Sequence, residues 1–197
     1  TGAYYGHASV GCLHIRPMVD TKTAADLAIL KGVSDEVASL VQEFGGAMTG
    51  EHGDGLARSY HNLKLFGPRL FHAFGEVKRL FDPEQLMNPG KVVETPSPIE
   101  NLRFGTSYPG ARVATYQDFT REEEFGGAPG QGFLAAAEMC NGSGVCRKTA
   151  TGTMCPSFMV TRDEEQSTRG RANALRLALS GQLPDGTLTS ERMWQVM

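Results

Sequence analysis

Apolar residues recur every three or four positions in two long segments of the chain. The first segment, residues 22–44, ends at a pair of glycines, which commonly stop a helix. The second segment, residues 67–81, ends at an Asp-Pro pair, which a helix does not readily pass. The pattern therefore predicts two amphipathic helices.

Residues 3–20 show a different pattern, in which Tyr, Val and Ile favour extended backbone. Gly11 interrupts this stretch and predicts a turn between two strands. A glycine-rich loop, residues 45–58, separates the two predicted helices, and the NPGK sequence at 88–91 predicts a turn into another short strand. Strands and helices in this mixture predict an α+β domain.

The pattern weakens over residues 95–133, where Pro, Gly, Arg and Glu dominate and periodicity is lost. This stretch is predicted to be a linker that holds one or two short strands, such as residues 111–119. Beyond it, residues 133–140 and 168–181 show helical patterns and flank a loop that contains cysteines. The last third of the chain is therefore predicted to be mostly helical.

The composition is that of an ordinary globular protein. Of its 197 residues, 40% are hydrophobic and 21% are charged, and the formal net charge is −3, which argues against a nucleic-acid binder. No apolar run approaches the roughly 18 residues of a membrane span, and no signal-peptide pattern opens the chain. We therefore expect a cytoplasmic protein. The sequence lacks an initiating Met and stops within a helical pattern, so we treat it as a fragment.

Histidines and a carboxylate form the first candidate site. His7 and His14 flank the predicted turn, and Glu51 lies in the glycine-rich loop. Two histidines and one carboxylate with an open position are the ligand set of a catalytic Zn²⁺ or a similar divalent ion. His52 lies next to Glu51 and is a candidate to accept a proton near neutral pH. The alternative is that these side chains make only local hydrogen bonds or stay solvated.

Three cysteines form the second candidate site, in the order Cys140-x5-Cys146-x8-Cys155-Pro. A run of cysteines that closes with Cys-Pro is typical of [4Fe–4S] ligation in bacterial ferredoxins. Ser143 occupies the place of the usual second cysteine, so the run lacks one thiolate ligand. The alternative is three free thiols.

The order of the motifs resembles one enzyme family. GH-x6-H, GEHGDG and FDPEQLMNPGK together resemble the C-terminal half of the FAD-linked oxidases of the vanillyl-alcohol-oxidase superfamily, in particular D-lactate, glycolate and D-2-hydroxyglutarate dehydrogenases. CNGSGVCRK, GTMCPSF and RGRANALR resemble the iron–sulfur domain fused to some of them. The resemblance implies an oxidase C-terminal domain over residues 1–95 with a ferredoxin-like antiparallel sheet, a linker over 96–132 and an iron–sulfur domain over 133–197.

The resemblance also implies a reaction, in which a D-2-hydroxy acid is oxidised to the 2-oxo acid and hydride passes to FAD. It places a divalent metal, for which we expect Zn²⁺, on His7, His14 and Glu51, with His52 as the general base. The remaining site residues take their roles from the same resemblance. Asn88 and Lys91 would lie against the flavin, Arg16 or Arg58 would bind the substrate carboxylate, and Cys140, Cys146 and Cys155 would ligate a 4Fe–4S cluster.

The resemblance further implies an electron acceptor. Electrons would pass from FAD through iron–sulfur centres to a quinone or to a soluble carrier. A quinone acceptor would bring the protein to the inner face of a membrane as a peripheral protein, and an oligomer is compatible with this function.

Two features depart from the family pattern. The hydroxy-acid dehydrogenases typically show G-H-x-G-D-G-N-x-H, and here Val10 and Cys12 stand in place of the Asp and the Asn. The pocket wall therefore differs, and the identity of the hydroxy acid stays open. The glycine-rich segment that binds the FAD phosphates is not in this sequence, so we expect the fragment alone to bind no FAD and to be inactive.

Two other functions stay open at the level of the sequence. A zinc hydrolase would use Glu51 or His52 to activate water, but it leaves the cysteines unexplained. An electron-transfer or docking module would keep the iron–sulfur site and lack substrate chemistry, in agreement with the replacements at Val10 and Cys12.

Overall fold

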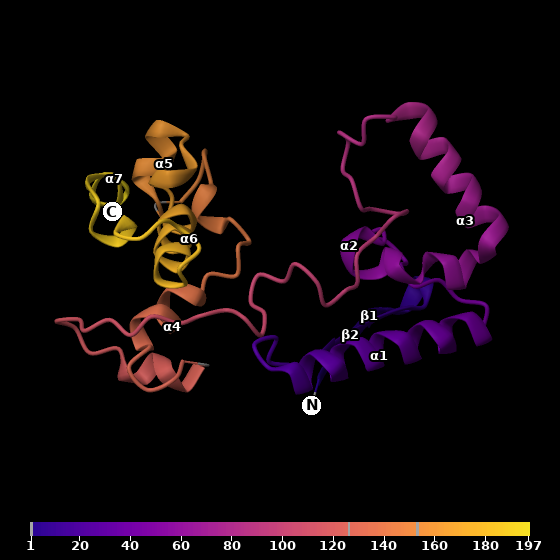
Figure 1. The fold of residues 1–197 in the computed structure, drawn as a ribbon, viewed down its shortest axis with the longest axis horizontal. Coiled ribbons are helices and arrows are strands. Elements are labelled where there is room, and N and C mark those ends of the chain that lie inside the picture. The colour runs from indigo at the N-terminus through magenta and orange to yellow at the C-terminus, as the bar shows by residue number, and fades with distance from the viewer. Residues whose placement is uncertain (1, 126, 153) are drawn as a thin grey trace. The chain divides into compact units, whose positions relative to one another are not determined.

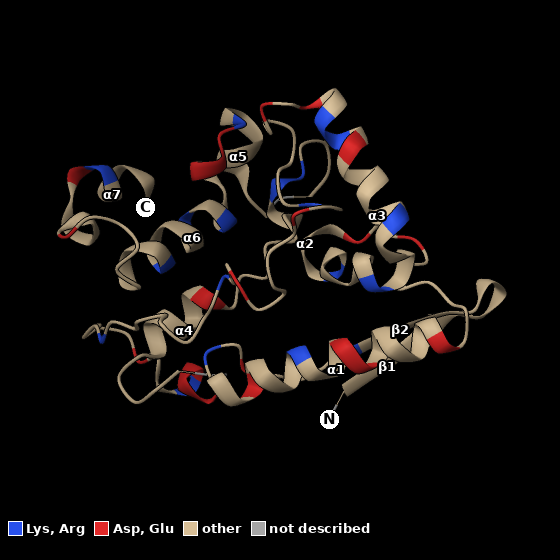
Figure 2. Ribbon diagram, turned by 45° about the vertical axis from the view of Figure 1, so that its right-hand side comes forward, with Lys and Arg blue, Asp and Glu red and all other residues tan. Residues whose placement is uncertain are grey.

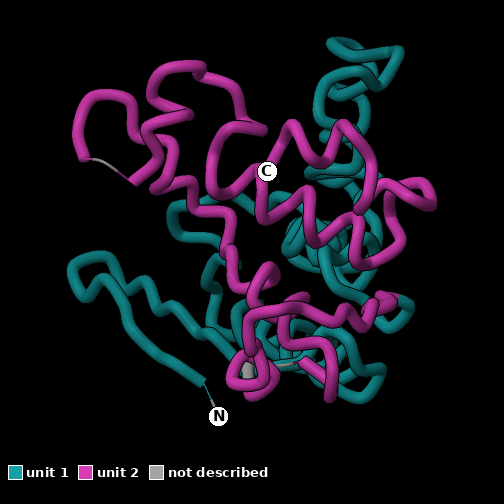
Figure 3. Tube along the Cα trace, turned by 90° about the vertical axis from the view of Figure 1, so that its left-hand side faces the viewer, with its two compact units in different colours: residues 1–107 teal, residues 108–197 magenta. Residues whose placement is uncertain are grey.

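The computed structural model describes residues 2–125, 127–152 and 154–197, and the chain forms two compact units. Unit 1 is Thr1–Ser107 and unit 2 is Tyr108–Met197 (Figure 3). The boundary lies within the segment that was expected to be a linker.

Unit 1 begins with a β-hairpin, which is followed by helices (Figure 1). Its elements are β1 (Gly2–His7), η1 (Ala8–Val10), β2 (Cys12–Pro17), α1 (Ala24–Glu43), α2 (Gly55–Arg58), η2 (Ser59–His61) and α3 (Asn62–Phe81). The sequence thus predicts the class of this unit correctly, because it combines an antiparallel sheet with helices.

The predicted pair of strands is confirmed, and glycines make it possible. The strands pair antiparallel with Gly6 opposite Leu13, and a Cβ atom at Gly6 would lie 2.5 Å from the carbonyl oxygen of Cys12. No other residue fits this approach without a shift of the backbone. Gly11 closes the turn at φ 66°, a left-handed conformation that glycine adopts at little cost.

Both predicted helices of unit 1 are confirmed. Thr23 caps α1, because its side-chain oxygen accepts a hydrogen bond from Asp26 N, and the helix then runs without a break to its end. The backbone of α3 leaves helical geometry at Gly67 (φ 73°, ψ 167°), directly before Pro68. The second predicted helix therefore corresponds to the part of α3 that follows this kink.

The sheet expected from the resemblance is larger than the one found, because the strands of the described residues number two. The ferredoxin-like sheet is therefore not formed by these residues. After NPGK, the backbone of Val92 is left-handed (φ 69°), which a strand excludes. Its N–H donates to Ser59 Oγ (3.0 Å) and its carbonyl accepts from Asn62 Nδ2 (3.1 Å), so side chains replace the strand partner. Residues 111–119 are also irregular rather than extended in a sheet.

The regular elements in the described part of unit 2 are all helices, as the sequence predicts, and irregular segments join them. Its elements are η3 (Thr120–Phe125), α4 (Gly132–Glu138), η4 (Val145–Arg147), α5 (Pro156–Thr161), η5 (Glu164–Gln166), α6 (Thr168–Leu179), η6 (Thr187–Thr189) and α7 (Glu191–Val196). A small core forms from Leu134 of α4, Phe158 of α5, Leu179 of α6 and Met193 of α7, all nearly free of solvent. Within this unit α4 and α6 pack against each other.

Acidic and basic residues follow one another along the ribbons of α1 and α3 (Figure 2). On α1, Lys31 Nζ lies 2.6 Å from Asp35 Oδ2, one turn away. This mixed surface agrees with the small net charge. No helix among the described residues is long and apolar enough to cross a membrane.

Candidate active site and metal centre

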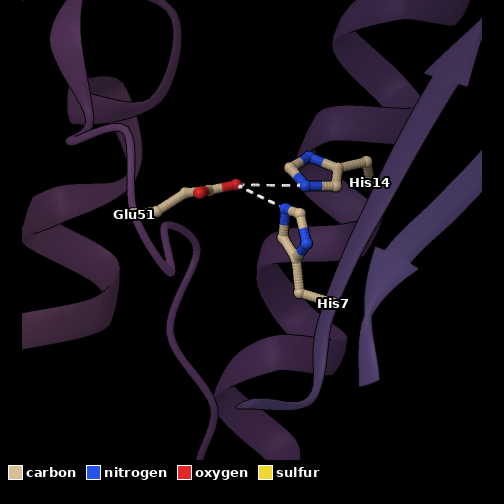
Figure 4. Close-up of side chains that lie close together, drawn as sticks. All are labelled: His7, His14 and Glu51. Carbon is tan, nitrogen blue, oxygen red and sulfur yellow. Dashed lines mark ion pairs between the residues drawn. The ribbon is translucent and has the colours of Figure 1, made fainter. Parts of the chain in front are cut away.

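Three imidazole nitrogens surround one carboxylate oxygen in unit 1. Glu51 Oε1 lies 3.1 Å from His14 Nε2 and 3.4 Å from His7 Nε2 (Figure 4). His52 Nε2 lies 3.2 Å from the same oxygen. The ligand atoms of His7, His14 and Glu51 all lie within 4.8 Å of one another, and among the described residues this is the one such group of three.

The hairpin register brings two of these histidines together. His7 ends β1 opposite Cys12, and His14 lies two residues further along β2, opposite Tyr5. Cys12 and His14 therefore share one face of the hairpin with their partners on β1. The ring of Tyr5 stacks on that of His14 with centroids 4.6 Å apart, which fixes the plane of the imidazole.

The glycine-rich loop brings Glu51 against this face of the hairpin. At Gly50, a Cβ atom would lie 3.2 Å from Cys12 Sγ, so the loop backbone approaches the hairpin closely. Thr49 Oγ1 donates to Asp54 Oδ1 (2.7 Å) and closes the loop around Glu51 and His52. The loop therefore has a defined shape on both sides of the carboxylate.

The donor set fits a divalent ion. Ligand atoms bound about 2.1 Å from one ion lie about 3.0–3.4 Å apart in octahedral or tetrahedral geometry. The distances from Glu51 Oε1 to His7 and His14 have this size. The Nε2 atom of His14 is buried, and its 3.1 Å approach to Glu51 Oε1 does not have the geometry of a hydrogen bond, as expected of two atoms that could share a metal ion. Nitrogen and carboxylate donors in this number suit Zn²⁺ and similar ions.

A cavity of about 540 Å³ opens beside the cluster. Glu51 and His52 line it together with His14, and the two candidate arginines, Arg16 and Arg58, line it as well. Apolar side chains of α1 line it too, namely Leu30, Val33 and Val37. The structure thus brings five of the predicted site residues in unit 1 around a space that can hold a small organic acid, and His7 contacts one of them, Glu51.

Asn88 and Lys91 lie elsewhere in unit 1. Lys91 Nζ donates to Asn88 Oδ1 at 3.4 Å, and neither residue lines the cavity. The turn before them is held by Asp82, whose carboxylate accepts from the backbone N–H of Leu86 (2.8 Å). An ion pair with Lys78, together with such backbone hydrogen bonds, lowers the pKa of Asp82. The NPGK turn is therefore well defined, but it forms a separate surface.

Sequence reasoning missed a buried polar network behind the cavity. His61 is 2% exposed, and its Nε2 lies 2.8 Å from Ser34 Oγ, a residue that lines the cavity. Its Nδ1 lies 3.9 Å from Asp35 Oδ1. Burial lowers the pKa of His61, so the imidazole is neutral near pH 7. The sequence carries no signal for it, because only tertiary packing buries this histidine.

The three cysteines of unit 2 are free thiols in different surroundings. Cys140 and Cys146 are partly exposed, whereas Cys155 is 5% exposed. Hydrogen bonds from the backbone of Phe158 and from the side chain of Ser157 lower the pKa of Cys155 to about 7. A thiol with this pKa is readily available as a thiolate ligand.

An arginine holds the loop between the first two cysteines. Arg169 Nη1 donates to the carbonyl of Gly142 at 3.0 Å, and the same guanidinium makes two hydrogen bonds to Glu164 (2.7 and 3.0 Å). The hydrogen bond to Glu164 raises the pKa of Arg169. The guanidinium cation is therefore held against the loop between Cys140 and Cys146.

Known proteins match the two units to different extents. Residues 1–92 match the family described as FAD linked oxidases, C-terminal domain. A D-2-hydroxyglutarate dehydrogenase of Pseudomonas putida is 36% identical over 191 residues, which are 95% of this chain and 18% of that protein. A D-2-hydroxyglutarate dehydrogenase of Haemophilus influenzae is 35% identical over 174 residues, which are 87% of this chain and 16% of that protein.

A D-lactate dehydrogenase of Archaeoglobus fulgidus is 36% identical over 89 residues, which are 45% of this chain and 19% of that protein. No solved structure gives a significant match. The chain thus spans less than a fifth of the length of these relatives. The match to the Pseudomonas putida protein extends over both units, whereas the match to the D-lactate dehydrogenase covers less than half of the chain. Unit 1 contains the region that matches the C-terminal domain of the FAD linked oxidases.

Proposed function

We propose that unit 1 is the substrate-binding part of an FAD-linked dehydrogenase that oxidises a D-2-hydroxy acid to the 2-oxo acid. The observation that carries this proposal is the convergence of three imidazole nitrogens on Glu51 Oε1, beside a cavity lined by arginines. The match of residues 1–92 to the FAD linked oxidases supports it, as do relatives that are named hydroxy-acid dehydrogenases.

In this proposal His7, His14 and Glu51 hold a divalent metal, which is Zn²⁺ in our expectation. When bound, the metal acts as a Lewis acid that lowers the pKa of the substrate hydroxyl. His52 takes the hydroxyl proton, because its Nε2 lies 3.2 Å from the carboxylate that marks the metal position. Arg16 or Arg58 binds the carboxylate of the substrate by paired N–H donors.

The oxidation removes two electrons and two protons from the hydroxy acid. The proton of the hydroxyl goes to His52, and the hydrogen on C2 leaves with the electron pair as hydride. FAD, when bound, is the acceptor of this hydride. Asn88 and Lys91 are proposed to lie against the flavin, since they form the defined NPGK turn of the matched domain.

Unit 2 is proposed to hold a 4Fe–4S cluster through Cys140, Cys146 and Cys155. Two features support this role: the lowered pKa of the Cys155 thiol and the cation of Arg169, which is hydrogen-bonded to the loop between the other two cysteines. When bound, the cluster carries single electrons onward to a quinone or soluble carrier. Ser143, in the position of a further cysteine, leaves one ligand of such a cluster to another residue.

An anaerobic visible spectrum of the full-length protein tests the function directly. Addition of D- and L-2-hydroxy acids one at a time is expected to bleach the flavin absorbance with a D-acid and not with its L-enantiomer. Iron–sulfur absorbance without flavin would instead favour the electron-transfer module. Hydrolysis of esters without any flavin would favour the zinc hydrolase.

A matched pair of histidine variants tests the proton acceptor. His52→Ala in the full-length protein is expected to lower kcat by about 100-fold or more, since general-base catalysis typically contributes that much. His72→Ala is the control, because His72 is an exposed histidine that pairs with Glu76 at 3.4 Å outside the site. Undiminished turnover of the His52 variant would contradict the assignment.

A further inference from the structure

We infer that Tyr5 is a positioning residue, which holds His14 for the metal and Arg16 for the carboxylate of the substrate. One aromatic ring thus links the metal end of the cavity to the arginine beside it. This inference rests on the proposed function and adds to it a residue outside the set that the sequence predicts.

The register of the hairpin brings these three side chains to one face. Tyr5 on β1 lies directly opposite His14 on β2, and Arg16 lies two residues further along β2, opposite Ala3. Side chains two residues apart on a strand point to the same face, and diagonal neighbours across a strand pair are within reach of aromatic and long side chains. The small side chain of Ala3 leaves room for Arg16 to reach the ring of Tyr5.

The ring of Tyr5 contacts both of its neighbours on this face. It stacks on the imidazole of His14, with centroids 4.6 Å apart and ring planes inclined by 22°. The guanidinium carbon of Arg16 lies over the same ring, 5.1 Å from its centroid, a distance at which the ring face attracts a cation. The side chain of His14 is 18% exposed, which leaves its imidazole little freedom to turn away from the ring.

The plane of the His14 imidazole matters because its Nε2 lies 3.1 Å from Glu51 Oε1, the other ligand atom of the proposed metal site. A metal binds an imidazole nitrogen in the plane of the ring, so the orientation of the ring decides whether Nε2 can face the ion. Partners that orient a histidine ligand typically change metal affinity by about 10–100-fold when they are lost. Loss of the Tyr5 ring is therefore expected to weaken metal binding although every ligand remains.

The same ring distinguishes the two arginines of the cavity. In a 2-hydroxy acid the hydroxyl and the carboxylate are on adjacent carbon atoms, so a hydroxyl at the metal places the carboxylate next to the metal ligands. Arg16 lines the cavity and is linked to His14 through Tyr5. Arg58 lines the cavity as well, but its Nη2 donates to the carbonyl of Gly53 in the glycine-rich loop (2.8 Å). Arg16 is therefore the arginine placed for this carboxylate.

Variants of Tyr5 in the full-length protein test both roles. Tyr5→Ile keeps a residue that favours strands but removes the ring, and it is expected to weaken Zn²⁺ binding about tenfold in a competition titration with a chelator. With Zn²⁺ at saturation, it should also raise KM about tenfold for the D-2-hydroxy acid that bleaches the flavin, with a much smaller change in kcat. Tyr5→Phe keeps the ring and should retain the wild-type values. Tyr4→Ile is the matched control, because Tyr4 lies on the opposite face of β1 and is 69% exposed.

A double-mutant cycle shows whether Tyr5 acts through Arg16. In an Arg16→Met background, Tyr5→Ile should raise KM no further, because the side chain that the ring positions is already absent. Additive losses in KM would contradict this link, since two independent contributions add.

The outcomes separate the inference from the function on which it rests. Unchanged Zn²⁺ affinity or unchanged KM in Tyr5→Ile, or equal losses in Tyr4→Ile, would overturn the joint role of Tyr5. A wild-type protein that is reduced by no D-2-hydroxy acid would contradict the proposed function, and Zn²⁺ affinity would then still decide whether Tyr5 positions His14. Circular dichroism checks the fold of each variant. If Tyr5→Ile is misfolded, Tyr5→Thr, which also favours strands and lacks a ring, must show both losses for the inference to stand.

Discussion

The two units of this chain organise their candidate sites in opposite ways. In unit 1, the histidines of a hairpin lie close to one carboxylate oxygen of a glutamate in a loop. In unit 2 the three cysteines are free thiols. Two of them are partly exposed, and the third, Cys155, is buried and hydrogen-bonded to Ser157 and Gln166. Contacts within the chain hold the side chains of the first site together. The cysteines of the second site would depend on a bound cluster to bring them together.

The difference follows from the elements that carry each site. In unit 1, strand register fixes which side chains share a face, and the close approach at Gly50 fixes the loop against that face. In unit 2, Cys140 follows a short helix, Cys146 lies in a 3-10 turn and Cys155 precedes another short helix. Separate short elements joined by loops do not set mutual distances as strand pairing does.

The relatives reflect the same division. The D-lactate dehydrogenase of Archaeoglobus fulgidus matches less than half of the chain, whereas the D-2-hydroxyglutarate dehydrogenase of Pseudomonas putida matches 95% of it. The family match ends at residue 92, before unit 2 begins. Some relatives of unit 1 thus also match unit 2, whereas others match less than half of the chain. Variants that affect only one of the two sites therefore test the role of each unit separately.

The largest expected effect is on metal binding by unit 1. Glu51→Gln removes the charge at the centre of the cluster and is expected to weaken divalent-metal binding by about 100-fold or more, since even changes around the ligands cost 10–100-fold. A competition titration with a zinc chelator measures this affinity. Glu76→Gln is the matched control, because Glu76 forms an isolated exposed pair with His72. Equal metal affinity in the two variants would contradict the metal site.

The second effect concerns iron in unit 2. Cys155→Ser in the full-length protein is expected to remove most of the iron and to leave the metal of unit 1 in place, because a hydroxyl is a poor ligand for iron–sulfur clusters. Metal analysis of the protein purified without oxygen measures both. Cys12→Ser, at the free cysteine of unit 1, should retain the iron. Iron loss from both variants, or from neither, would contradict the assignment of Cys155.

The sequence predicts those parts of unit 1 that depend on local chemistry. The turn at Gly11 and the end of α1 shortly before Gly45 follow from residues near them in the chain. The contact of His7 with Glu51 is different, because the residues next to each of them do not determine that the loop packs against the hairpin. The ordered set of motifs indicated that grouping, and the structure brings the side chains together. Their chemical roles stay predictions.

The sequence fails where distant side chains decide the backbone. The strand expected at Val92 is absent because Ser59 and Asn62 bind its N–H and carbonyl across thirty residues or more. The importance of His61 is likewise invisible, since its burial depends on the packing of α1 against the start of α3. Both features come from long-range contacts that periodicity does not encode.

The third effect is a pH dependence that belongs to unit 1. Burial lowers the pKa of His61, an effect that nearby Lys64 and Lys31 reinforce and Asp35 opposes. The unfolded chain binds this proton near the ordinary pKa of 6.5, so stability is fully present above that pH and is lost as pH falls toward the lowered pKa. The loss is expected to reach up to about 1.4 kcal/mol per pH unit.

His61→Gln is expected to remove this dependence, because an amide can still meet Ser34 but does not titrate. Hydrogen-exchange mass spectrometry of unit 1 peptides in a urea series, at pH 7.5 and at pH 5.5, measures the change. His72→Gln replaces an exposed histidine and should retain the wild-type dependence. The same dependence in His61→Gln and in the wild type would show that another group is responsible.

The smallest expected effect is a loss of stability when one helix cap is removed in each unit. Thr23 Oγ1 accepts from Asp26 N on the surface of unit 1, so Thr23→Ala is expected to cost about 1 kcal/mol. Ser167 Oγ accepts from Gly170 N (2.9 Å) but is fully buried and also donates to the carbonyl of Glu164 (2.7 Å). Ser167→Ala removes both of these buried hydrogen bonds, although the Glu164 carbonyl keeps the backbone N–H of residue 167 (2.9 Å), and is expected to cost about 2 kcal/mol. Peptide-resolved hydrogen exchange measures each loss in its own unit. Equal losses would mean that the second hydrogen bond of Ser167 adds nothing, and a larger loss in unit 2 would mean that buried polar contacts order the segment next to its cysteines.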